Sequence, residues 1–107
     1  MKLEDLIATE DELLNATMEK LANNVLLCLS KGNKSVPIRR RGLAGRLVMG
    51  YPQEFGKRCL YAIEESIMYL EHQMLIGIDP DEREFVFLTR KGQQQAIAAE
   101  KELLVSA

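Results

Sequence analysis

Apolar residues recur along this chain at helical spacing and then in two short runs. Over residues 52–74 they follow steps of three and four after the first, which predicts an amphipathic helix of about six turns. The runs at residues 75–78 and 85–88 are short enough for strands, and the polar segment 79–84 between them contains Pro80 and turn-forming aspartates. We therefore expect a long helix followed by a β-hairpin. The apolar positions of the helix are Phe55, Leu60, Ile63, Ile67, Leu70 and Met74.

Helical patterns also flank this unit. Thr9 and Glu12 have the spacing of a capping box, and apolar residues then keep to one helical face until Gly32 ends the pattern. This predicts one support helix over residues 10–31. Residues 35–38 are predicted as a small edge strand and residues 39–49 as a short helix. Thr89 is placed to cap a last helix over residues 90–105.

These elements predict an α+β, mostly helical fold, a winged helix-turn-helix with a two-stranded β-hairpin wing and flanking N- and C-terminal helices. The chain is expected to form a single domain over residues 1–107, with the winged core at residues 35–92 and the flanking helices at 10–31 and 90–105. At 107 residues, nearly half of them apolar, it is long enough to bury one core without metals or disulfides.

Charge is distributed unevenly along the chain. Residues 31–58 hold eight cations against Glu54 alone, a net charge of +7, whereas residues 1–30 carry −4 and residues 59–107 carry −5. A polyanion would be attracted to this basic block and repelled by its flanks. A solvated basic loop is the alternative interpretation of the same charges.

The position of the basic residues indicates how DNA would be bound. A recognition helix contacts bases with its N-terminal residues, and arginine and glutamine pair with guanine and adenine. The second half of the helix is acidic and is expected to point away from DNA. In the acidic wing tip, only Arg83 could enter a minor groove. The expected groove contacts are Gln53, Lys57, Arg58 and Tyr61, and the expected phosphate contacts are Arg39, Arg40, Arg41 and Arg46.

The sequence around residues 88–92 resembles a known superfamily. Leu88, Thr89, Lys91 and Gly92 match the sequence at which the second wing strand meets the following helix in MarR/PadR-like winged-helix proteins. The resemblance covers about residues 35–95, at superfamily level. It implies dimeric transcription regulation with residues 52–61 as the recognition end. It also implies that Leu88 lies in the core, Thr89 caps a helix and Gly92 is closely packed. The acidic wing and the long third helix depart from the common pattern.

The resulting expectation is a winged-helix DNA-binding protein, a dimeric regulator that contacts double-stranded DNA through the start of the third helix and the arginine block. The homodimer is expected to form through the N- and C-terminal helices. The alternative is a winged-helix protein–protein interaction module, an adaptor or complex subunit without DNA binding of its own. A third interpretation, a regulator that senses a small molecule, requires a pocket that sequence does not reveal.

Patterns of catalysis and cofactor binding are missing from the sequence. Cys28, Cys59 and His72 lack the spacing of a zinc site, and no serine or cysteine has a base partner nearby. We expect no enzyme activity, no cofactor and no metal. Free thiols, the lack of an N-terminal leader pattern and the lack of a membrane-spanning apolar run predict a cytoplasmic protein with no membrane partner.

Overall fold

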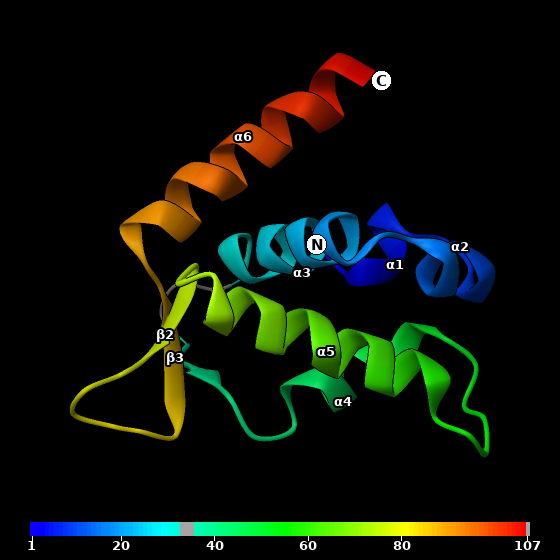
Figure 1. Cartoon of the computed structure of the whole chain (residues 1–107), viewed down its shortest axis with the longest axis horizontal. Helices are drawn as coiled ribbons and strands as arrows, with labels where there is room; N and C mark the ends of the chain where they lie inside the picture. Colours follow the sequence, from blue (N-terminus) through cyan, green and yellow to red (C-terminus); the bar gives the residue numbers. More distant parts are fainter. Residues whose placement is uncertain (33–35, 107) are drawn as a thin grey trace.

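The protein has an α+β fold in which a small antiparallel sheet lies at one end of a group of helices (Figure 1). The computed structural model describes residues 1–32 and 36–106. In chain order the elements are α1 (Leu3–Leu6), α2 (Glu10–Asn15), α3 (Met18–Ser30), β1 (Ile38–Arg39), α4 (Leu43–Leu47), η1 (Val48–Gly50), α5 (Arg58–His72), β2 (Ile76–Ile78), β3 (Phe85–Leu88) and α6 (Arg90–Ser106).

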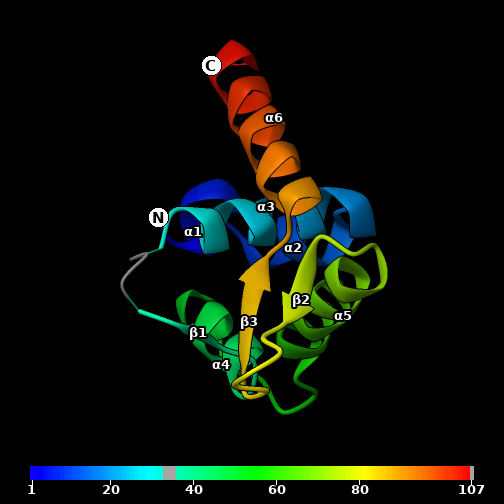
Figure 2. The same cartoon turned by 90° about the vertical axis from the view of Figure 1, so that its left-hand side faces the viewer.

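The sheet confirms the predicted hairpin and adds a third strand to it. β2 pairs with β3 in antiparallel register, with Gly77 opposite Phe87, and β1 pairs with the other edge of β3, with Ile38 opposite Val86. Figure 2 shows β3 between its two neighbours. The predicted edge strand at residues 35–38 is observed only at its end, because β1 begins at Ile38 and residue 35 lies outside the described residues.

The core lies mainly between α3 and α5, which pack against each other (Figure 1). Val25 and Leu26 of α3 are fully buried, as are Ile63, Ile67 and Leu70 of α5. The predicted apolar stripe is therefore confirmed at these positions, and each helix buries one stripe as an amphipathic helix should. Among the described residues, no helix is long and apolar enough to cross a membrane.

The prediction of one continuous support helix over residues 10–31 is wrong, because the structure has two helices there, α2 and α3. α2 ends at Asn15, whose side-chain amide donates to the carbonyl of Asp11 (2.8 Å). Thr17 then takes an extended conformation and its hydroxyl accepts from the amide of Lys20 (3.1 Å), which makes it the N-cap of α3. A threonine cap satisfies helix-start amides that a continuous helix would bond internally. The apolar periodicity continues across the break and conceals it.

The long helix is shorter than its apolar pattern predicts. It was expected over residues 52–74, but α5 begins only at Arg58, so Pro52, Gln53 and Phe55 lie in a loop. Lys57 has a left-handed backbone (φ 55°), which a helix cannot include, and Gly56 before it lowers helix propensity. At the other end Met74 is also left-handed (φ 60°).

The remaining two helical predictions have different outcomes. The helix predicted at residues 39–49 is only a turn and a half of α4 followed by the 3-10 turn η1, since Arg39 belongs to β1 and Gly42 is left-handed (φ 76°). The last helix is confirmed as α6. The Thr89 hydroxyl accepts from the amide of Gly92 (3.0 Å), as its predicted cap role requires.

Candidate nucleic-acid interface

The structure divides the nine predicted DNA contacts among three places. Four arginines lie on β1, on α4 and in the turn between them. Four residues lie in the loop before α5 and in its first turns. Arg83 alone lies in the hairpin turn. The first group is Arg39, Arg40, Arg41 and Arg46, and the second is Gln53, Lys57, Arg58 and Tyr61.

Arg40 is engaged within the chain. Its guanidinium donates to the carboxylates of Glu64 (2.7 Å) and Glu71 (3.0 Å) on α5. The hydrogen bonds that Arg40 donates to the Glu64 carboxylate raise the pKa of Arg40 against the opposing effect of burial. Its backbone amide also donates to the carbonyl of Glu84 (2.9 Å), at the end of the hairpin turn. Arg40 therefore joins the sheet to α5 and is not free to bind a phosphate.

The other three arginines of this group remain exposed. Arg39 lies over the ring of Phe85, 5.8 Å from its centroid, and Arg46 donates to the backbone carbonyls of Arg39 and Arg41. Neither contact neutralises a charge with a carboxylate. Within residues 1–32 and 36–106, none of the three forms an ion pair. They can therefore contribute full positive charge to a surface.

At the start of α5, Arg58 is held by acidic residues. Its guanidinium bonds Glu54 (2.9 Å) and Glu10 of α2 (3.1 Å), and its amide donates to Glu54 (3.0 Å). These bonds from Arg58 lower the pKa of the Glu54 carboxyl. Lys57 is exposed and forms no ion pair among the described residues, and Gln53 is exposed in the loop rather than on a helix. Only Lys57 offers uncompensated charge here.

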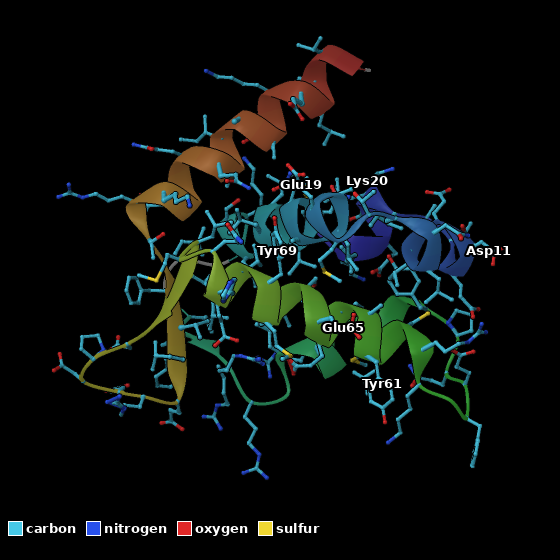
Figure 3. All side chains as sticks on the ribbon, viewed as in Figure 1. Asp11, Glu19, Lys20, Tyr61, Glu65 and Tyr69 are labelled. Atoms are coloured by element: carbon cyan, nitrogen blue, oxygen red, sulfur yellow. The ribbon has the colours of Figure 1, made fainter. Side chains whose placement is uncertain are left out.

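The outer face of α5 is mixed in character. Tyr61 projects from the side of the helix opposite α3 (Figure 3), and Tyr61 and Met68 are each 57% exposed. Glu65 and His72 share this exposed side at helical spacing. Beyond its first turn, this face therefore has aromatic, apolar and acidic side chains.

The hairpin turn is closed by its own acidic residues. The carboxylate of Asp79 accepts from the amides of Asp81 (2.9 Å) and Glu82 (3.0 Å), and these bonds lower the pKa of Asp79. Arg83 is exposed between Glu82 and Glu84 and forms no ion pair within the described part of the chain. Negative charge dominates this tip.

One group of possible metal ligands has another explanation. The ligand atoms of Glu10, Glu54 and Cys59 lie within 4.8 Å of one another. The Arg58 guanidinium already binds both carboxylates, so a cation is present in the form of a side chain. Cys28 and Cys59 are buried free thiols, as expected, and burial raises the pKa of Cys28 to about 11.

An open groove of about 1140 Å³ lies between the end of α3, the sheet and α6. Its walls are mainly apolar, and its charged lining residues are Lys31, Arg39, Arg46 and Glu100. Sequence does not reveal it because its walls come from segments far apart in the chain.

Sequence reasoning missed the partners of Arg40. Glu64 and Glu71 are seven residues apart, so they share one face of α5, and this spacing is a visible signal for a shared cation. Which cation they bind depends on how the sheet docks against α5. Comparisons with protein-family models, with curated proteins and with solved structures find no match for this chain.

Proposed function

We propose that the chain is a winged-helix DNA-binding protein and acts as a dimeric transcriptional regulator. The observation that carries the proposal is the order of elements: α4 and α5 precede a hairpin whose second strand pairs with β1. A helix-turn-helix followed by one wing has its elements in this order, and the proposal rests on that match. It supports α5 as the helix that enters the major groove.

Under this proposal, the contact set is smaller than the sequence suggests. Arg39, Arg41, Arg46 and Lys57 are exposed and have no carboxylate partner among the described residues, so they bind phosphates. Arg40 and Arg58 instead fix the sheet and the loop against the helices. Gln53 and Tyr61 lie beside the groove. The acidic hairpin tip stays outside the minor groove because phosphates repel it.

The dimer proposal is supported by an exposed stripe on α6, of which Ile97 also lines the groove beside the sheet. Gln94, Ile97, Lys101 and Leu104 are exposed at steps of three and four, and Ile97 and Leu104 are 55% and 70% exposed. The other side of α6 is occupied by α3, through the Gln95–Asn23 hydrogen bond (2.7 Å). Figure 1 shows the end of α6 extending away from the other elements. A second α6 would bury the exposed stripe.

Fluorescence anisotropy tests the DNA proposal. We expect salt-sensitive binding of a mixed-sequence duplex, with log affinity falling against log salt by about 0.9 per phosphate bound. Arg41→Ala/Lys57→Ala removes two such contacts and reduces that slope by about 2. The matched control, Lys20→Ala/Arg90→Ala, removes the same charge from exposed positions on α3 and α6 and leaves the slope unchanged.

A second candidate function, a protein interaction module, is favoured by the outer face of α5. Its exposed Tyr61 and Met68 suit a protein partner, and Arg40 and Arg58 are already neutralised. No duplex binding even at low salt would overturn the DNA proposal and favour this candidate. Equal losses in both double variants would assign binding to overall charge instead of the proposed surface.

A further inference from the structure

The loop between η1 and α5 carries an aromatic side chain that is fully exposed to solvent. Phe55 is 104% exposed, which is the exposure of a fully extended peptide. Large aromatic side chains gain most from burial, so one held in water is costly unless a partner covers it. In Figure 1 this green loop lies at the end of α5 far from the sheet.

Hydrogen bonds fix the loop on both sides of Phe55. Before it, Tyr51 is buried and its hydroxyl donates to the carbonyl of Ile7 (2.6 Å). Across it, the carboxylate of Glu54 on one side accepts from the amide (3.0 Å) and guanidinium (2.9 Å) of Arg58 on the other. The aromatic ring is thus carried on an ordered loop, and little loop entropy is lost when it meets a ligand.

The residues that follow provide the chemistry of a nucleic-acid contact. Lys57 is exposed without an ion pair among the described residues and directly precedes α5. The exposed Tyr61 lies in the first turn of α5, and its amide donates to the carbonyl of Lys57 (2.9 Å). Aromatic rings interleaved with cations bind nucleic acid because the rings stack on bases while the cations bind the phosphates between them. Phe55, Lys57 and Tyr61 form such a set within seven residues.

We propose that Phe55 stacks on a nucleobase, with Lys57 on the adjoining phosphate and Tyr61 beside the same site. The base comes from a single strand or from a duplex step that Phe55 opens as a wedge. The proposal deepens the nucleic-acid-binding function above and rests on it. Its ligand is the face of a base, whereas the phosphate contacts of the arginines require no base at all.

The lack of tryptophan in the chain makes a direct test possible. Phe55→Trp introduces the only tryptophan, and Val105→Trp at the exposed end of α6 is the matched control. Each is titrated with a duplex and with a single strand of the same sequence. We expect quenching of Phe55→Trp and no change in Val105→Trp. Quenching by both nucleic acids or by the duplex alone supports a base taken from the duplex.

Affinity of further variants separates stacking from simple burial. Phe55→Ala and Phe55→Leu are both expected to weaken binding by about tenfold, since the loss of one stacked base is worth that much. Full rescue by leucine would overturn stacking, because leucine fills an apolar pocket equally well. Because the side chain is fully exposed in the folded chain, both variants should unfold at the wild-type temperature.

Other outcomes distinguish this proposal from the proposed function. Quenching by the single strand with no duplex binding supports the base site and overturns the duplex-binding regulator. Normal duplex affinity in Phe55→Ala with no quenching of Phe55→Trp overturns the base site and leaves the regulator standing. A blue shift of Phe55→Trp with anionic lipid vesicles, together with no quenching by nucleic acid and no duplex binding in anisotropy, overturns both.

Discussion

Met74 lies two residues after the end of α5, in a left-handed backbone conformation that L-residues with a Cβ rarely adopt. The Leu75 amide donates to the carbonyl of Leu70 (2.9 Å) and the Met74 amide to that of Glu71 (3.1 Å), the two bonds of a Schellman motif. Met74 occupies the left-handed position of this motif, which is usually glycine. A residue with a Cβ costs about 1–2 kcal/mol of conformational free energy there.

Met74→Gly is therefore expected to raise the free energy of unfolding by about 0.5–1 kcal/mol, after the entropy of the unfolded glycine is subtracted. The Met74 side chain is largely exposed, so little burial is lost. Urea denaturation measures the change. Glu65→Gly, at a right-handed helical position on the same helix, should instead lower stability by about 1 kcal/mol. A loss of stability in Met74→Gly would contradict this account of the helix end.

Gly92 is required for a different reason, the close approach of two backbones. A Cβ at this position would lie against the carbonyl oxygen of Leu75, which belongs to the backbone and cannot rotate away. Gly92→Ala is expected to cost about 3 kcal/mol or more, since α6 must separate from the start of β2.

Gly45→Ala is the control for Gly92→Ala, since a Cβ there meets nothing within 4 Å. It should stabilise α4 by up to about 1 kcal/mol. Thermal unfolding of both variants gives the comparison, and equal stability of the two would disprove the steric account. The sequence motif already pointed to close packing at Gly92, whereas nothing in the sequence distinguished Met74 from a helical residue.

At the scale of elements, sequence periodicity predicted which segments are helices more reliably than where they begin. Phe55 fits no repeat of the α5 stripe, and Gly56 follows it, so the late start of α5 was visible in principle. The break at Thr17 was not, because an apolar stripe can continue across a capped break without changing its spacing. The ion pairs of Arg40 depend on docking between elements, which no local pattern encodes.

The proposed dimer is also a property of one element, the exposed stripe of α6. Ile97→Glu/Leu104→Glu places charges at its two apolar positions and is expected to shift a dimer to monomer in analytical ultracentrifugation. Tyr61→Glu/Met68→Glu puts the same charges on the outer face of α5 and should leave the dimer intact. A monomeric wild type at all concentrations would remove α6 as the interface.

At the scale of the whole molecule, the uneven distribution of charge is more useful than the net charge of −2. Within the basic block, Arg40 and Arg58 form ion pairs with carboxylates of the same chain. The three other arginines stay exposed around β1 and α4. The sequence correctly locates the basic segment, but counting its charges overstates the positive charge that is available to a binding partner. The α+β class and the hairpin followed from pattern alone, while the groove beside α6 required the folded chain.

Under the DNA-binding proposal, the carboxylates that hold Arg40 limit how many base pairs one chain can read. Arg40, Glu64 and Glu71 together carry a net negative charge, so a DNA backbone is kept from the second half of α5. The part left to face bases, residues 58–63, is about 9 Å long, close to the rise of three base pairs. A given sequence of three base pairs occurs by chance about once in 64 positions. A recognition sequence of three base pairs is too short for a single chain to select one site in a genome. Under the proposal, a selective site therefore requires two half-sites, each bound by one chain of a dimer.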